Sequence, residues 1–555
     1  MSASSKKKLR NAQEAEKMTE KQLKEQQEAK KLKTYSTIFV VVIALMVCFA
    51  VYTAVTNTIE HSGIVERNTT ALNVGDHKVS SAELNYYFID SVNNFYSQYG
   101  SYAAMFGLDV TKPLDEQFIG GDETTTWAAD FLNSAKENIK AVYALNDAAE
   151  AAGYTLPEAE VSEIDMQITN MKSYAMLYGY NDFNDYLKAM YGNGATEKGF
   201  REYVTMTALA DSFQSHYAET LTYDDAALRA EEADNYAKYS AFSYNTYYLS
   251  TAKFLEGGTT AEDGTVTYSD EEKETARAAA ETTAQVLAVA ENNTVDALNA
   301  AIAALPINSE ATAASDTYVN KSYTSINSIV SEWVTDDARV AGDITVIPSV
   351  THSHAEGETH SDDEDTSAYD TVNGYYVVLF VNRDDNTFPL VNVRHILVSF
   401  EGGSYDAATG MTTYTEEEKA AARVKAEELL NAWKSGEATE DSFAALAKEE
   451  STDPGSSENS GLYEDVYPGQ MVTAFEDWCF AEGRKAGDTG IVETEYGCHV
   501  MFYSADSEVI YRDFLIENAL ISADTSAWYT DLLEAMVVTE VNTKYIRTDL
   551  VLAPQ

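Results

Sequence analysis

Thr413–Arg423 reads TYTEEEKAAAR, and Thr267–Arg277, 146 residues earlier, reads TYSDEEKETAR. The two stretches agree at seven of eleven positions. Each also has a hydroxyl residue followed three positions later by Glu, the capping-box pattern that opens a helix. We therefore expect two tandem copies of one fold in this chain.

The repeat extends in both directions from these stretches. Trp333 and Gly342 recur as Trp478 and Gly487 at an offset of 145, whereas GYYV at 374–377 matches GCHV at 497–500 at an offset of 123. An insertion near 349–370 accounts for the difference. Each copy begins with a strand (242–250 and 391–400) and ends with one (375–381 and 499–505). This order predicts two small α+β domains, 238–385 and 386–505, whose first and last strands are neighbours.

The residues outside the repeats are predicted to be mostly helical. Residues 57–237 should form a helical domain with a short hairpin over 71–79. Residues 506–555 should form one or two helices and a final strand over 543–552. The helices that we expect in the first region follow the hairpin and cover 84–99, 127–152, 158–178, 183–190 and 197–219.

The stretch 35–56 carries no charge and is long enough to cross a bilayer as a helix. Lys30, Lys31 and Lys33 precede it, so we expect a cytoplasmic tail at 1–34 and an extracytoplasmic chain after residue 56. A buried core helix is the alternative, but such a helix needs no lysine-rich leader. A cleaved signal peptide would have a shorter apolar region.

The chain after this stretch is strongly acidic. The 555-residue chain has 38 basic and 90 acidic residues. Of these, 28 basic and 85 acidic residues follow position 56, which gives that part a formal charge of −57. Such a surface should repel nucleic acid. Only Cys479 and Cys498 lie in this part, which excludes a disulfide scaffold. They can pair with each other, or be two buried thiols, which we favour.

Two histidines of the second copy are predicted to share one face of its sheet. Strand alternation places His395 with Val393 and Leu397, and places His499 with Gly497 and Met501. The two imidazoles can therefore meet across the sheet. A histidine considered alone is more often a hydrogen-bonded core residue than a catalyst.

Three blocks of the second copy resemble the parvulin family of peptidyl-prolyl isomerases: VRHILVSF at 393–400, STDPGSSENSGLYEDVYPGQMVTAFEDWCF at 451–480 and GDTGIVETEYGCHVMFY at 487–503. They occur in the family's order and spacing. The resemblance implies an isomerase that uses no cofactor and no metal. It implies a polar group of His395, Asp453 and His499, and a proline-binding group of Leu462, Met471 and Phe475. The run SGLYEDVYPGQM around Leu462 departs from the family's usual GGDLG.

Isomerisation of an Xaa-Pro bond makes and breaks no covalent bond, so an apolar socket with a few polar groups can catalyse it. Met471 and Phe475 are four residues apart and can share a helix face. Plain core residues are the alternative for this pair. No Lys or Arg occurs from Ile396 to Glu418, which argues against a preference for phosphorylated substrates.

The first copy lacks these groups. Aligned through the repeat, Tyr247 stands near the position of His395, Tyr376 at that of His499, Ile326 at that of Met471 and Val330 at that of Phe475. We expect a domain of the same fold without isomerase activity. Its insertion holds His352, His354 and His360 among acids, which suits a metal site less well than a solvated acidic loop.

Two stretches before the repeats, LNVGDHKVSSAEL at 72–84 and AAEAAGYTLPEAEV at 148–161, resemble the helical domains of SurA-type and PrsA-type foldases. This resemblance implies that 506–555 packs on the N-terminal domain. The aromatic stretch 84–102 is a candidate client-binding face, and core packing of its aromatics is the alternative. The sequence thus predicts a single-pass membrane protein with an extracytoplasmic foldase region acting on unfolded exported proteins. A holdase without isomerase activity, or a surface structural protein, are the alternatives.

Overall fold

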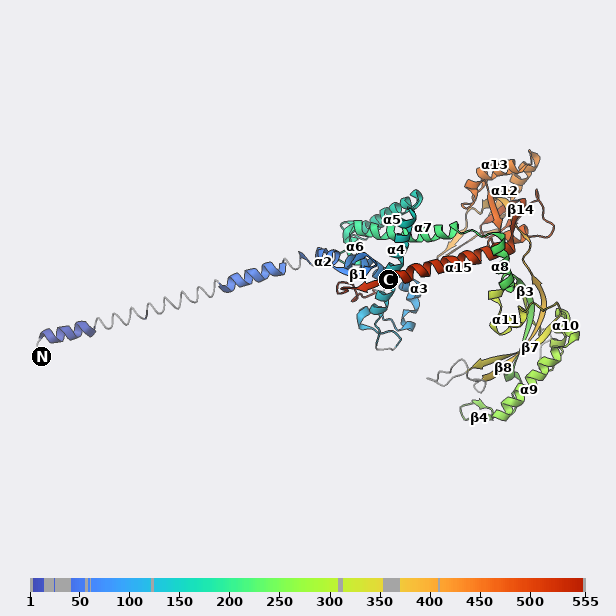
Figure 1. The fold of residues 1–555 in the computed structure, drawn as a ribbon, viewed down its shortest axis with the longest axis horizontal. Coiled ribbons are helices and arrows are strands. Elements are labelled where there is room, and N and C mark those ends of the chain that lie inside the picture. The colour runs from blue at the N-terminus through green and yellow to red at the C-terminus, as the bar shows by residue number, and fades with distance from the viewer. Residues whose placement is uncertain are drawn as a thin grey trace. The chain divides into compact units, whose positions relative to one another are not determined.

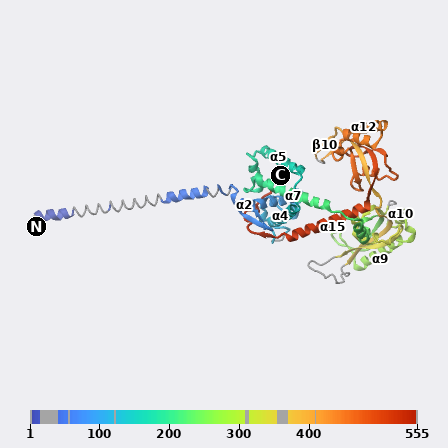
Figure 2. The ribbon, with the colours of Figure 1, turned by 45° about the horizontal axis from the view of Figure 1, so that its top comes forward.

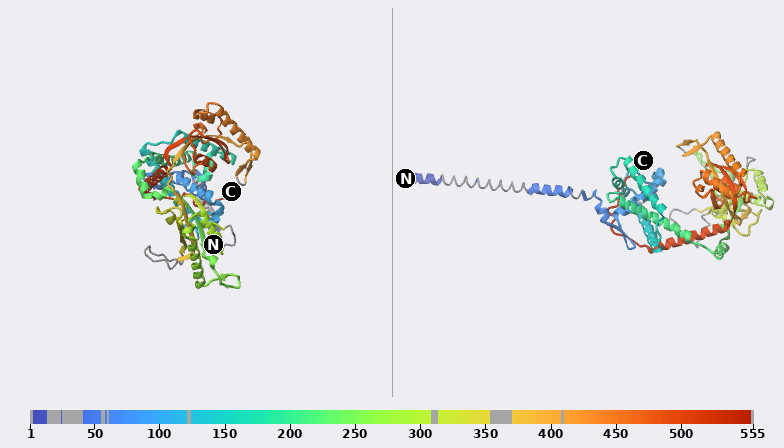
Figure 3. Two further views of the ribbon diagram at one scale, coloured as in Figure 1. Left: turned by 90° about the vertical axis from the view of Figure 1, so that its right-hand side faces the viewer. Right: turned by 90° about the horizontal axis from the view of Figure 1, so that it is seen from above.

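The structure is a computed structural model that describes residues 3–13, 24, 41–54, 58–59, 61–120, 124–307, 313–352, 370–407 and 410–552. The chain divides into two compact units. The first unit comprises 1–221 and 522–555, and the second comprises 222–521. In Figure 3 the first unit is blue to green with a deep-red C-terminal piece, and the second runs from green to red.

The first unit is mostly helical. Its long helices begin at hydroxyl residues that accept a hydrogen bond from the first turn, such as Thr126 and Thr196. Its small antiparallel sheet has the order β15-β1-β2. The elements are α2 (Ile64–Asn68), β1 (Thr70–Val74), β2 (His77–Ser80), α3 (Ser81–Tyr99), α4 (Trp127–Ala152), α5 (Glu158–Leu177), α6 (Phe183–Tyr191), α7 (Glu197–Thr220) and β15 (Val538–Glu540).

The aromatic helix α3 faces the core of this unit in its N-terminal half. Tyr86, Tyr87 and Phe88 are almost fully buried and belong to the main apolar cluster. The interpretation of 84–102 as a client-binding face is therefore wrong for this half, because the rings that would contact a client already pack against other helices. Tyr102, beyond the end of α3, is exposed.

The C-terminal residues return to the start of the first unit. Leu72 of β1 pairs with Glu540 of β15, and Val74 pairs with Val538. The strand that we expected over 543–552 is wrong, since those residues form turns and the strand lies just before them. One continuous helix, α15 (Tyr511–Ala535), precedes it (Figure 1).

The second unit contains two four-stranded antiparallel sheets of matching order, β6-β3-β8-β7 and β12-β9-β14-β13. In each sheet the first and last long strands of the copy are central neighbours. The elements of the first copy are β3 (Ala241–Ser250), β4 (Thr259–Thr260), β5 (Val266–Thr267), α9 (Asp270–Leu287), α10 (Val295–Ala303), β6 (Asp316–Ser322), α11 (Ser328–Val334), β7 (Ile344–His352) and β8 (Asp370–Asp384). Those of the second are β9 (Pro389–Ser399), β10 (Ser404–Asp406), β11 (Met411–Thr413), α12 (Glu416–Ser435), α13 (Glu440–Glu450), β12 (Leu462–Val466), α14 (Thr473–Cys479), β13 (Thr489–Glu493) and β14 (Gly497–Ile510).

Helices cover both faces of each sheet. In the second copy, α12 and α13 pack on the face that carries Ile396 and Val500, and α14 packs on the face that carries Val393 and Met501. Figure 2 labels α12 over this sheet and α9 over the first. The two expected capping boxes are present, at Ser269 of α9 and Thr415 of α12.

A buried arginine joins the two sheets within the second unit. The guanidinium of Arg512, 1% exposed, donates to the carboxylate of Glu232 in α8 (Asp225–Asn235) and to the carbonyls of Tyr236 and Asp385. Asp385 lies in the short link between the two copies. Five hydrogen bonds from one planar donor group fix the conformation of this link.

Within the described part of the chain, no helix has both the length and the apolar character needed to cross a membrane. The stretch 35–56 lies partly outside the described residues, and those that are described include a helix over 41–54. His354 and His360 of the insertion also lie outside them.

A candidate active site on the second sheet

Strands β9 and β14 bring two buried histidines together. His395 pairs with Met501 and Leu397 pairs with His499, so the imidazoles are diagonal neighbours on one face. The Nδ1 atoms of His395 and His499 are 3.0 Å apart, and the side chains are 2% and 5% exposed. One of the two nitrogens donates to the other.

The second nitrogen of each imidazole also has a partner. Nε2 of His395 lies 3.1 Å from Oδ2 of Asp453 and 2.9 Å from Oγ of Ser456. The Ser456 hydroxyl donates to the same Asp453 oxygen at 2.6 Å. At the other end, Nε2 of His499 lies 2.8 Å from the hydroxyl of Thr494. A continuous chain of hydrogen bonds thus runs from Asp453 to Thr494.

The surroundings of this hydrogen-bond chain set the charges of Asp453 and His499. Burial raises the pKa of Asp453, but the hydrogen bonds from His395 and Ser456 outweigh it and hold that pKa below its usual range. Burial, followed by the nearby His395, lowers the pKa of His499 to about 4. At neutral pH the site therefore holds an ionised carboxylate beside a neutral His499.

The apolar side of the site is the ring of Phe475. Its plane is nearly perpendicular to both imidazoles, with ring centroids 5.3 Å from His395 and 5.5 Å from His499. Met471 is partly buried against the same cluster. A pocket of about 800 Å³ opens beside this group and is lined by Phe400, Tyr414, Val472 and Thr494, among others.

Of the six residues predicted for the site, the structure does not bring Leu462 to the group. Leu462 pairs with Arg394, whereas Tyr463 pairs with Val393. Cross-strand partners share a face, so Tyr463 lies on the face of His395 and Leu462 on the other. The Tyr463 hydroxyl donates to Asp453 at 3.0 Å.

Three residues of the hydrogen-bond chain were not predicted from the sequence: Ser456, Tyr463 and Thr494. Ser456 stands three positions after Asp453, a spacing at which a hydroxyl can reach a carboxylate within one turn. Tyr463 stands next to Leu462, and the alternation of its strand could have identified it. Thr494 gives no comparable signal, because it follows β13 and reaches His499 of β14 only through the turn between these strands.

The register corrects one assignment in the first copy. Met501, the partner of His395, corresponds to Val378 by the offset of 123, and Val378 pairs with Thr246. Thr246 therefore occupies the position of His395, and Tyr247 faces the opposite cluster. The error is one residue, which reverses the face in a strand. Tyr376 lies at the position of His499 and contacts Tyr248, with ring centroids 4.8 Å apart.

Cys479 and Cys498 are both buried free thiols. They belong to the apolar clusters on opposite faces of the sheet. Burial raises the pKa of Cys479 to about 12, so this thiol stays protonated and unreactive at neutral pH.

Comparison with known proteins finds a family match that includes the second sheet. Residues 375–504 match the family model described as the PPIC-type PPIase domain. The match includes both histidines, Asp453 and Phe475, and it begins within β8 of the first copy.

The curated relatives are foldases. The chain is 36% identical over 113 residues to foldase protein PrsA 1 of Listeria innocua, which covers 20% of this chain and 30% of that protein. It is 31% identical over 125 residues to foldase protein PrsA 2 of Listeria monocytogenes, covering 22% and 38%. The match thus spans less than a third of the length of the first of these relatives.

Solved structures give a local likeness. PrsA from Bacillus anthracis is 22% identical, with 27% of this chain and 59% of that chain covered and a TM-score of 0.18. A structure of SurA-like chaperones of Campylobacter jejuni is 28% identical, covering 28% and 56%, with a TM-score of 0.15.

Proposed function

Because the chain carries a parvulin-type peptidyl-prolyl isomerase domain, we propose that this protein catalyses cis/trans isomerisation of Xaa-Pro bonds in exported polypeptides and holds them while they fold. The observation that carries the proposal is the hydrogen-bonded group of His395, His499 and Asp453 against the ring of Phe475. These residues fall within the matched segment 375–504.

The proposed mechanism requires no covalent step. The proline ring of the substrate packs against Phe475 and Met471, and the peptide bond beside it twists near the histidines. The uncatalysed barrier is about 20 kcal/mol, most of it lost amide resonance. A site that excludes water and donates hydrogen bonds to the twisted amide lowers this barrier. The ionised Asp453 orients His395, and His395 orients His499.

The remaining parts of the chain fit a foldase. We assign client holding to the helical domain 57–237, on which 506–555 packs through the β15–β1 pair. We assign a fold-preserving role without isomerase activity to 238–385, and the isomerase role to 386–505. The uncharged stretch 35–56 serves as a single membrane anchor with the acidic region outside the cytoplasm.

The test is the rate of cis/trans exchange of a short Xaa-Pro peptide in the presence of the purified protein. The proposal expects acceleration over buffer that scales with protein concentration. A rate equal to that in buffer alone would refute the isomerase assignment.

A holdase without significant isomerase activity is the second candidate. It is favoured by the replacement of the catalytic groups in the first copy and by the departure of 460–466 from the family pattern, where Leu462 faces away from the site. Under this alternative, suppression of client aggregation survives His395→Ala and His499→Ala unchanged, and no exchange activity accompanies it.

A further inference from the structure

A second pocket lies in the helical unit. Its volume is about 660 Å³, within the range of ligand-binding pockets. It is formed where α3 and α7 begin and where α4 passes them. Tyr86, Tyr143, Tyr203 and Met206 are among the residues that line it.

Two carboxylates face this pocket. Glu83 accepts a hydrogen bond of 2.6 Å from the Tyr143 hydroxyl and forms no ion pair with any residue that the structure describes. Burial raises the pKa of Glu83, the Tyr143 hydrogen bond lowers it, and the nearby Glu202 raises it. Among the charged groups near Glu83, Glu202 raises its pKa and His77 lowers it.

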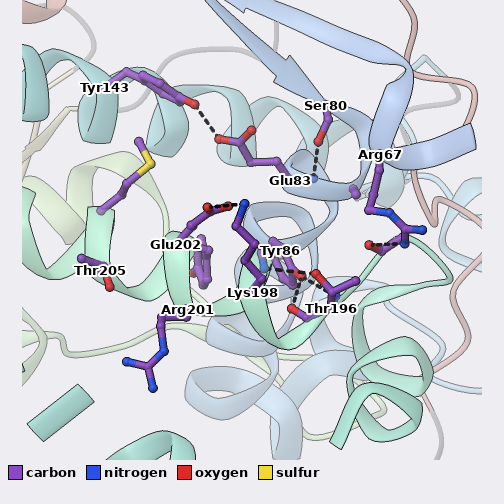
Figure 4. A pocket seen from close by; sticks show the side chains of 15 residues that line it. Arg67, Ser80, Glu83, Tyr86, Tyr143, Thr196, Lys198, Arg201, Glu202 and Thr205 are labelled. Atoms are coloured by element: carbon purple, nitrogen blue, oxygen red, sulfur yellow. Dashed lines mark hydrogen bonds and ion pairs between the residues drawn. The ribbon is translucent and has the colours of Figure 1, made fainter. Parts of the chain in front are cut away.

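Of the three cations that line the pocket, Arg67 and Arg201 bind groups other than its two carboxylates and Lys198 pairs with Glu202. Arg67 donates to the carbonyl of Gly194, and Arg201 pairs with Asp165 at 2.6 Å and points away from Glu83 (Figure 4). Lys198 lies 3.5 Å from Glu202 but its side chain is 87% exposed, so it forms a solvated pair at the rim. The inner part of the pocket therefore combines negative charge with aromatic faces.

We propose that this pocket binds a lysine or arginine side chain of an extended client segment, with the cation between Glu83 and Glu202 and its aliphatic stem against Tyr203 and Met206. The inference rests on the proposed client-binding function and names the kind of residue that the helical unit selects. A cation near tyrosine faces gains from both the carboxylates and the rings. Long basic side chains also bury their stems on apolar surface while the charged end stays at a polar group.

The test uses the full chain and three labelled peptides that differ at one central residue: lysine, norleucine and glutamate. Norleucine keeps the stem and removes the charge. Fluorescence anisotropy at low ionic strength should give about fivefold to tenfold tighter binding for the lysine peptide than for the norleucine peptide. The glutamate peptide should bind more weakly than both.

Variants of the two carboxylates test whether the lysine preference arises in this pocket. Glu83→Gln and Glu202→Gln should each remove most of the lysine preference and leave the norleucine affinity unchanged. Glu202 is largely exposed, so its variant keeps the fold even if Glu83→Gln does not. The control is Glu219→Gln, an exposed acid farther along α7, which should change neither affinity.

Equal affinity for the lysine and norleucine peptides would overturn the proposal. An equal loss of the lysine preference in the Glu219→Gln control would also overturn it, because that result would reflect the overall negative charge of the chain. Binding of the norleucine peptide without a lysine preference contradicts this inference alone. Failure to bind any of the three peptides contradicts client holding as well. Isomerase rates measured on the same samples separate both outcomes from failure of the catalytic assignment.

Discussion

The ring of Phe475 packs nearly perpendicular to both histidine rings and is 2% exposed. Because the ring is buried, its truncation removes core packing as well as the socket wall. Phe475→Ala should destabilise the domain by about 3 kcal/mol, the usual cost of emptying a buried aromatic position. It should also slow isomerisation at temperatures where the domain stays folded. Chemical denaturation and peptide exchange rates measure the two effects.

Met471→Ala provides the matched comparison, because Met471 is only partly buried against the same cluster. It should lose activity with a smaller loss of stability. If Phe475→Ala remains folded and retains full activity on an Xaa-Pro peptide, the assignment of the proline socket must be abandoned.

The lowered pKa of His499 leads to a prediction of how the stability of the fold depends on pH. Its pKa is about 4 in the folded protein against 6.5 for the ordinary side chain. Between these values the unfolded chain binds the extra proton, so stability falls as pH drops from about 6.5 to 4, by up to about 3 kcal/mol. Asp453 adds loss of stability only at lower pH, because its own pKa is depressed.

Hydrogen exchange in β9 and β14, corrected for the intrinsic pH dependence of amide exchange, measures this change. In His499→Gln the slope between pH 6.5 and 4 should disappear, while His216→Gln, a change at an exposed histidine of the other unit, should leave it intact. An unchanged slope in His499→Gln would show that other groups cause the acid sensitivity.

A site residue could be predicted where the family resemblance or the alternation of side chains along a strand identifies it. His395 and His499 follow from strand alternation, and Asp453 from the family pattern. Tyr463 could have been identified from the alternation of its strand, whereas Thr494 could not, because its contact with His499 depends on the turn between β13 and β14. Leu462 failed because the register of β12 places it on the other face.

At the scale of elements, the hairpin β10–β11 is held to α12 by one carboxylate. Glu418 accepts hydrogen bonds from the amides of Gly403 at 2.9 Å and Thr415 at 2.7 Å, and these lower its pKa. Gly403 has φ of 81°, which favours glycine at this position. The first copy repeats the contact between Glu272 and Gly258.

Glu418→Ala should therefore release the hairpin while the sheet stays formed. Amides of 404–406 and 411–413 should exchange faster, and the N-terminal turn of α12 should fray because its capping box is lost. Glu417→Ala, one residue away and exposed in the same turn, is the control. Equal exchange in the two variants would mean that packing rather than Glu418 holds the hairpin.

The boundaries of α4 to α7 were predicted within one residue, because capping residues or turns mark most of them, whereas α3 begins three residues earlier than predicted. The strands β6 and β7 were not predicted, since their sequences are short or partly exposed and lack a clear alternation. The opposite error occurred over 543–552, where an apolar pattern led us to predict a strand but the residues form turns.

For the whole molecule, the internal repeat gave the strongest information. Offsets between the two copies predicted paired first and last strands, and both sheets have that order. The repeat could not give the function of the first copy, because a slip of one residue exchanged Tyr247 for Thr246 at the critical position. Catalysis depends on which face a side chain occupies, and sequence matches do not fix that face.

The most direct test compares matched changes in the two copies of the full chain. His395→Ala with His499→Ala alters the second copy, and Thr246→Val with Tyr376→Phe alters the corresponding positions of the first. Exchange rates of an Xaa-Pro peptide, measured alongside melting curves, should fall at least tenfold for the first pair and stay at the wild-type value for the second. Wild-type activity in the histidine double variant, or an equal loss in the first-copy variant, would contradict the assignment of catalysis to the second sheet.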